Sequence, residues 1–167
     1  MRKLLQLAAV ALVLVFAACG PSTEDVISYN DGIVADQSEL IMMENEIVEN
    51  IYDYYDYPAS KKSYDAYTAK VNELLTKYEE MKPFDDEDEF RVAMIDLLKV
   101  HKEQLEEYYL VIIDFMEVYP DVSEVDDESA ENIVVILDAI LEATNAQNEK
   151  FLETQKVFAK KYNVELI

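Results

Sequence analysis

Pairs of apolar residues recur every seven positions between residues 26 and 55, and this repeat strongly constrains the fold. The pairs are Val26-Ile27, Ile33-Val34, Leu40-Ile41, Ile47-Val48 and Tyr54-Tyr55. On an α-helix this spacing places every pair on one stripe. The repeat predicts a helix over residues 24–56, or one that begins only after Gly32, because glycine inside a helix costs about 1 kcal/mol relative to alanine.

Three internal prolines, Pro58, Pro83 and Pro120, separate this segment and three more that also have a helical period. No stretch alternates between apolar and polar residues for long enough to predict a strand. Four helices joined by short loops pack most simply as a bundle. The sequence therefore predicts an all-α fold, an up-down-up-down antiparallel four-helix bundle.

The expected ends of these helices follow from residues that favour N-caps. Ser60 is expected to cap the second helix, Asp85 or Asp86 the third, and the fourth is expected to start near Asp126 to Ser129. The third helix is expected to bury one stripe of residues: Phe90, Met94, Leu97, His101, Leu105, Tyr108, Ile112, Phe115 and Tyr119.

The first nineteen residues have the pattern of an export signal. A basic start, Met1–Lys3, precedes a short apolar run, Leu4–Ala18, and then Cys19, the only cysteine. This order is typical of a secretory signal peptide. The run is shorter than the roughly 20 residues that a membrane-spanning helix needs. We divide the chain into a signal peptide (1–18), a tether (19–25) and a helical domain (26–167).

The stretch Phe-Ala-Ala-Cys at residues 16–19 resembles the lipobox of bacterial lipoproteins, although the family usually has leucine where Phe16 stands. The resemblance implies cleavage before Cys19 and attachment of acyl chains to it, which would anchor the protein in the lipid bilayer. Gly20, rather than aspartate, follows the cysteine, which in this family favours the outer membrane, on its periplasmic face or at the cell surface. The alternatives are an ordinary signal peptide or an uncleaved anchor.

The chain is strongly acidic, with a formal charge of −22 that becomes −24 once residues 1–18 are removed. It lacks the basic patch that phosphate binding needs, so we expect no nucleic-acid partner. A surface of this charge attracts cations and basic partners, although it also serves solubility alone.

In an antiparallel bundle, the loops near Pro58 and Pro120 lie at the end away from the N-terminus. We call these loops, residues 52–58 and 118–129, the distal tip. They hold five tyrosines and seven acids without a lysine or arginine, a composition that suits a surface for a protein, a peptide or a cation. The alternative is that the tyrosines cap the core and the acids are solvated. The candidate residues are Tyr52, Asp53, Tyr54, Tyr55, Asp56, Tyr57, Tyr119 and Asp121.

Polar residues also interrupt the apolar stripes at similar heights along three helices. Buried without partners, such groups would cost several kcal/mol. Three interpretations remain open: they satisfy one another and fix the helix register, they point outward, or they line a ligand pocket. A single histidine is too few for a usual zinc or iron site. The candidates are Gln37, Glu44, His101, Asn145, Gln147 and Asn148.

We find no nucleophile motif, phosphate-binding loop or metal-ligand spacing, so we expect neither catalysis nor a cofactor. The stretches YNDGIV (29–34) and FAKKYNVEL (158–166) are similar to small bacterial surface lipoproteins of unassigned function. This resemblance implies an all-helical envelope protein. The sequence thus favours a lipoprotein that binds a partner at the distal tip. The alternatives are a small-ligand or cation carrier built around His101, and an envelope spacer.

Overall fold

The computed structural model describes residues 20–166, and within this range the chain is helical with no strand. This result confirms the predicted all-α fold class. A π-helical turn, η2, connects α4 to α5, and a short 3-10 helix, η3, precedes α6. The bounds are α2 Thr23–Tyr52, α3 Tyr57–Glu80, α4 Glu89–Gln104, η2 Leu105–Tyr109, α5 Leu110–Val118, η3 Val122–Glu124 and α6 Asp127–Tyr162.

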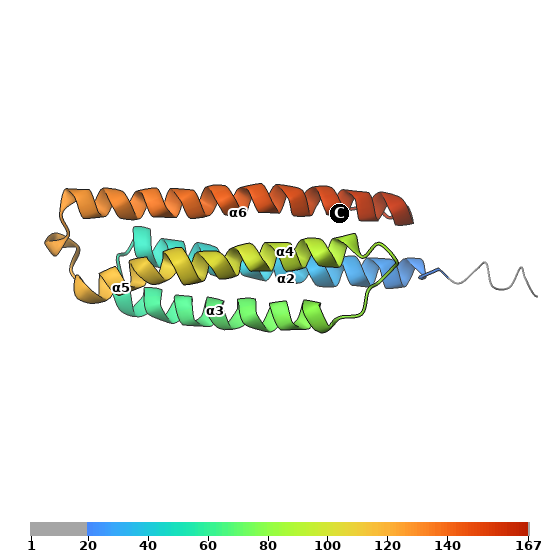
Figure 1. The fold of residues 1–167 in the computed structure, drawn as a ribbon, viewed down its shortest axis with the longest axis horizontal. Helices are drawn as coiled ribbons and strands as arrows, with labels where there is room; N and C mark the ends of the chain where they lie inside the picture. The colour runs from blue at the N-terminus through green and yellow to red at the C-terminus, as the bar shows by residue number, and fades with distance from the viewer. Residues whose placement is uncertain (1–19, 167) are drawn as a thin grey trace, which may run out of the picture.

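The helices lie along one long axis (Figure 1). The loop between α2 and α3 lies at one end together with η3, whereas the start of α2 and the α3–α4 loop lie at the other end. Helix α3 packs on α2 and on α4, and α6 packs mainly on α4. The loops that form the distal tip are thus at the end away from the first residues of α2.

Helix α2 begins at Thr23 with a capping box, in which Ser22 and Asp25 bond each other's backbone N–H groups. The alternative start after Gly32 is wrong, because the helix runs through this glycine. Gly32 is exposed and no atom of a neighbouring element lies within 4 Å of an added Cβ, so packing does not require it. The helix ends at Tyr52, earlier than the predicted residue 56.

The N-cap of α3 is Asp56, whose carboxylate accepts a hydrogen bond from the backbone N–H of Ala59 at 3.0 Å. The prediction that Ser60 caps this helix is wrong, since Ser60 is buried inside it. Pro58 lies in the first turn, where its missing N–H costs nothing. The proline that was expected to precede the helix is therefore part of it.

Asp85 caps a turn rather than a helix. Its carboxylate accepts hydrogen bonds from the backbone N–H groups of Glu87 at 3.1 Å and Asp88 at 2.6 Å. Helix α4 itself begins only at Glu89, so the predicted N-cap at Asp85 or Asp86 is displaced by one turn.

Helix α6 begins where the sequence predicts. The carboxylate of Asp126 accepts a hydrogen bond from the backbone N–H of Ser129 at 2.8 Å. The helix ends at Tyr162, and Asn163 closes it in the left-handed conformation with φ 53°, which asparagine tolerates better than most residues.

The π-helical turn changes which face of the following helix is buried. Tyr109 is buried there, whereas Tyr108 and Tyr119 of the predicted stripe are exposed. Residues in η2 advance by more than 3.6 per turn, so the apolar face after it is displaced by about one residue. The stripe predicted for the third helix is correct up to Leu105 and wrong at Tyr108 and Tyr119.

Aromatic rings fill the core at the end away from the distal tip. Phe90 lies between Phe151 and Phe158, with ring centroids 5.2 Å from each. Tyr29 stacks on Phe84 at 4.3 Å. These contacts join α2, α4, α6 and the α3–α4 loop, so the end nearest the N-terminus is held by aromatic packing.

Candidate functional site

Glu44 of α2 is the centre of a polar layer in the middle of the core. The side chain is buried, and its Oε1 lies 3.0 Å from Thr144 Oγ1 and 3.9 Å from His101 Nδ1. Burial raises the pKa of Glu44 to about 7, although hydrogen bonding to Thr144 opposes the rise. The carboxyl therefore exchanges its proton near neutral pH.

The hydrogen bonds around Thr144 favour a proton on Glu44 for a separate, geometric reason. Thr144 Oγ1 lies within bonding distance of two acceptors, Glu44 Oε1 and Gln104 Oε1, the latter at 3.1 Å. A hydroxyl has only one proton to donate. Both contacts are satisfied together when Glu44 is protonated and donates to Thr144, which then donates to Gln104. When Glu44 is ionised, Thr144 can donate to only one of these two acceptors, and the other contact has no proton.

Gln104 extends this chain to the backbone, because its Nε2 donates to the carbonyl of Ile140 at 3.0 Å. Gln104 belongs to α4 and Ile140 to α6. The polar layer thus connects α2, α4 and α6 through buried hydrogen bonds, which contribute most when every group is paired.

His101 lies on the other side of Glu44 and is also buried. Its Nδ1 lies 2.7 Å from the hydroxyl of Tyr67 in α3. Burial lowers the pKa of His101 to about 4, so the ring is neutral at pH 7. Its Nε2 is buried without a hydrogen-bond partner among the described residues.

Two further polar contacts continue along the interface of α2 and α6. Gln37 Nε2 donates to Asn148 Oδ1 at 2.9 Å, and Gln155 Nε2 donates to Asn30 Oδ1 at 3.0 Å. Asn30, Gln37 and Glu44 are spaced by seven residues. We call these three α2 residues and their α6 partners the polar seam. This seam favours the first interpretation, in which polar groups satisfy one another.

The structure brings together most of the predicted layer. Gln37, Glu44 and His101 are buried, and Asn148 is half-buried against Gln37. Asn145 is exposed, so its assignment to the layer is wrong. One position away, Thr144 faces the core instead.

Gln147 is half-buried and lies apart from Glu44. It lines a surface pocket of about 250 Å³ between α4 and α6, together with Gln104 and Lys150. Four residues of the layer were not singled out from the sequence. Thr144 and Tyr67 lie among the apolar residues of their helices, and Gln104 stands next to the stripe predicted for the third helix. The missed residues are Tyr67, Gln104, Tyr109 and Thr144.

The tyrosines of the distal tip divide into exposed and anchored side chains. Tyr52 and Tyr54 are 63% and 64% exposed. Tyr55 is half-buried, and its hydroxyl donates to the carbonyl of Tyr119 at 2.9 Å. Tyr57 is half-buried at the start of α3. The bond from Tyr55 joins the two loops of the tip into one surface.

The predicted acids of the tip act mainly on the local backbone. Asp56 caps α3, and Asp121 accepts a hydrogen bond from the backbone N–H of Ser123 at 2.9 Å. Asp53 follows the last residue of α2 and is exposed. Asp56 and Asp121 are thus explained by turn formation without a ligand.

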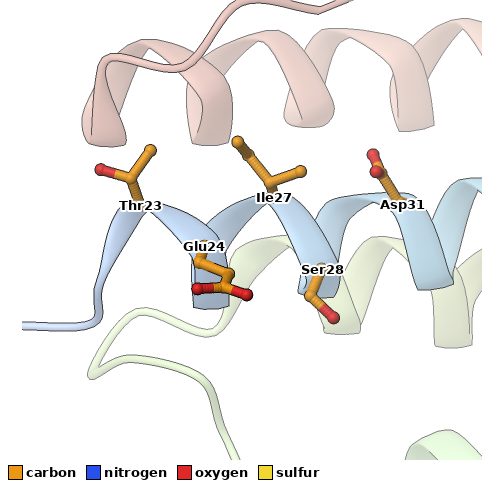
Figure 2. Close-up of a pocket in the computed structure, with 5 residues that line it drawn as sticks. All are labelled: Thr23, Glu24, Ile27, Ser28 and Asp31. Atoms are coloured by element: carbon orange, nitrogen blue, oxygen red, sulfur yellow. The ribbon is translucent and has the colours of Figure 1, made fainter.

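A wide, open hollow of about 650 Å³ lies along the first turns of α2. Figure 2 shows its lining: Thr23, Ile27 and Asp31 point toward α6, whereas Glu24 and Ser28 point away from it. All five residues belong to one helix, and none of them is buried. The hollow is therefore an open surface rather than an enclosed binding site.

Comparison of the chain with protein-family models, with curated proteins and with solved structures found no match. None of the helices within residues 20–166 is long and apolar enough to cross a membrane. In the same range, no three His, Cys, Asp or Glu side chains are grouped so that they could hold a metal ion. The predicted lipid site, Cys19, lies outside the described residues.

Proposed function

We propose that the protein is a bacterial envelope lipoprotein, without a catalytic role, that binds a partner protein or peptide at the distal tip. The observation that carries the binding proposal is the hydrogen bond between Tyr55 and the Tyr119 carbonyl. It makes one surface out of two loops, from which Tyr52 and Tyr54 project into solvent. Tyrosine is enriched at interfaces because it offers apolar area together with a hydroxyl.

The proposal includes an anchor and an orientation. Acyl chains on Cys19 would fix the protein to the outer membrane, and an up-down-up-down antiparallel arrangement would hold the distal tip away from the lipid. The start of α2, four residues after Cys19, lies at the end opposite the tip (Figure 1). A firm anchor of this kind needs more than one acyl chain.

The test replaces Tyr52 and Tyr54 with serine. We expect chemical cross-links between the protein and its envelope partner to fall at least tenfold, since both rings are exposed. Within the protein, the change removes one exposed hydrogen bond, from the Tyr54 hydroxyl to Glu49. Tyr108→Ser is the matched control, because Tyr108 is exposed on another part of the molecule. Helical content, measured by circular dichroism, should stay unchanged in all variants. Equal cross-linking by the double variant and the wild type would overturn the proposal.

A second candidate function is that of a small-ligand or cation carrier. Its support is His101 Nε2, which is buried and has no hydrogen-bond partner among the described residues. Gln104 connects this layer to the pocket of about 250 Å³. A ligand of this site would raise the melting temperature of the wild type and not that of His101→Ala. A screen of small polar molecules and cations by thermal melting separates the two functions.

A further inference from the structure

A second surface near the distal tip is apolar rather than tyrosine-rich. A pocket of about 160 Å³ lies between α5 and the first turns of α6, lined among others by Val111 and Phe115 of α5 and by Ile133 and Ile136 of α6. It exists because α5 packs on α3 while α6 packs mainly on α4. An apolar cavity of about 150 Å³ can hold benzene. The pocket therefore has room for one aromatic or branched aliphatic side chain.

Exposed valines extend this pocket into an apolar strip. Val111 and Val118 of α5 are 53% and 67% exposed and are seven residues apart. Val135 of α6 is 60% exposed and lies one turn after Asn132, which lines the pocket. Seven residues of helix span about 10 Å. On a partner helix, side chains at positions i and i+7 lie on one face and are the same distance apart. The strip therefore suits a partner helix that packs along it.

The negative charge near the pocket determines which kind of partner helix can bind there. Between Lys102 and Lys150 the chain has fourteen acidic residues and no lysine or arginine. Asp114 of α5 and Glu128 and Glu131 of α6 are exposed, and each is next in sequence to a residue that lines the pocket. A second copy of this chain would bring the same negative charge to the interface and be repelled. A cationic partner would be attracted.

We propose that the pocket between α5 and α6 binds a cationic amphipathic helix of a partner protein, which inserts one aromatic or branched aliphatic side chain. This inference rests on the proposed function, because it names the chemistry of a partner bound at the same end of the molecule. The acids would pair with lysine or arginine on the partner's flanks, and the valines would cover its apolar face.

The test measures binding of a labelled 18-residue helical peptide of leucine and lysine, with one central phenylalanine, to the purified full chain by fluorescence anisotropy. We expect saturable binding that weakens at least tenfold between 50 and 500 mM salt, as attraction between opposite charges requires. A scrambled peptide of equal composition and a peptide of lysine alone should bind at least tenfold more weakly. Equal binding of the lysine peptide would overturn the inference, since charge alone would then suffice.

Variants identify the pocket. Asn132→Trp should fill it, and Val111→Ser with Val135→Ser should remove the apolar strip; each change is expected to weaken binding at least tenfold. Val157→Ser is the matched control, because Val157 is an equally exposed valine at the other end of α6. Circular dichroism verifies that each variant is folded. Unchanged binding by the folded pocket variants, or a dimer that Asn132→Trp disrupts, would overturn the inference.

The same experiment separates this inference from the proposed function. The Tyr52→Ser and Tyr54→Ser variant should bind the model peptide as the wild type does, because neither tyrosine lines the pocket. If the peptide fails to bind while the tyrosine variant still loses its cross-links in the envelope, the tip function stands and the cationic helix is wrong. If the peptide binds while the tyrosine variant keeps its cross-links in the envelope, the cationic helix stands and the tip function is wrong.

Discussion

Glu44 shows how one buried proton can connect three helices. Its carboxyl in α2 contacts Thr144 of α6, which contacts Gln104 of α4. The chain of hydrogen bonds is complete only with the carboxyl protonated, as the count of donors requires. A change in pH near neutrality therefore acts on packing at the centre of the molecule and not only on its surface charge.

We expect Glu44 to make the free energy of unfolding fall as pH rises from 4.5 to 7. In this interval the unfolded state releases the proton while the folded state, with a pKa of about 7, retains it. The full loss is about 3 kcal/mol. Glu44→Gln should remove this dependence, and Glu107→Gln, an exposed control, should retain it. Urea unfolding followed by circular dichroism measures the free energy of unfolding of both variants at each pH. If this free energy depends on pH in the same way in Glu44→Gln and in the wild type, the pH dependence does not come from Glu44.

His101 should have the opposite effect over a lower interval. The unfolded state binds a proton below pH 6.5, whereas the buried ring resists it until about pH 4. Stability due to His101 therefore rises between pH 4 and 6.5. The two slopes offset each other between pH 4.5 and 6.5 in the wild type. His101→Gln should reveal a falling profile, and Glu44→Gln a rising one. If the free energy of unfolding does not change with pH in either variant, Glu44 and His101 do not have these opposite effects.

At the residue scale, the sequence predicted that a buried polar layer exists, but it did not predict every residue of that layer. The seven-residue spacing of Gln37 and Glu44 in a regular helix was enough to place both in the interface. The assignment of Asn145 was wrong because a shift of one residue turns a side chain by about 100°. Four of the five residues from 144 to 148 are polar, so the sequence offered no basis for choosing among them. Thr144 could have been found, since it lies in the apolar stripe of α6.

At the element scale, the polar seam fixes how α2 lies against α6. Gln37→Ala would leave Asn148 half-buried without its partner, and we expect a loss of about 1 kcal/mol. Ser38→Ala is the control, because this exposed hydroxyl bonds only the Val34 carbonyl of its own helix. Chemical denaturation measures both. Equal stabilities would show that the seam contributes specificity of register and not stability.

The π-helical turn η2 is the element that sets the buried face of α5. Deleting Glu107 should convert it to a regular helix without rotating α5 relative to α4, because a π-helical turn accommodates one extra residue. Ile112, Ile113 and Met116 would then stay in the core, and we expect the free energy of unfolding to change by less than about 1 kcal/mol. Deleting Ser123 from the exposed connection before α6 is the control. A melting temperature of the Glu107 deletion more than about 5 °C below that of the control would contradict this role of η2.

Periodicity predicted the helices themselves but not this turn. Residues 90–105 follow a regular pattern, and the same pattern continued would bury Tyr108. Nothing local in Leu-Glu-Glu-Tyr-Tyr distinguishes a π-helical turn from an α-helical one, because the choice depends on which tyrosine the other helices can accommodate. The end of α3 before Pro83 and the cap at Asp126 were predictable, since both depend on backbone chemistry of a few residues.

At the scale of the whole molecule, the lipid anchor is testable without the partner. Cys19→Ala should move the protein from the membrane fraction to the soluble fraction, because the variant has no thiol to carry the acyl chains. The intact mass of the wild type should exceed that of residues 19–167 by several acyl chains. A wild-type chain that begins at Met1, or that carries no added mass, would refute the anchor.

The stretch between Lys102 and Lys150, which lacks basic residues, has a consequence for orientation. It includes the distal ends of α5 and α6, where acids stand without lysine or arginine, whereas at the other end of the molecule lysines of α3 and α6 offset part of the acidic charge. Such a rod has an electric dipole moment along its length. Close to an anionic surface, within about one Debye length, the field would exert a torque that favours an upright posture over a flat one. The charge distribution alone would then help expose the far end.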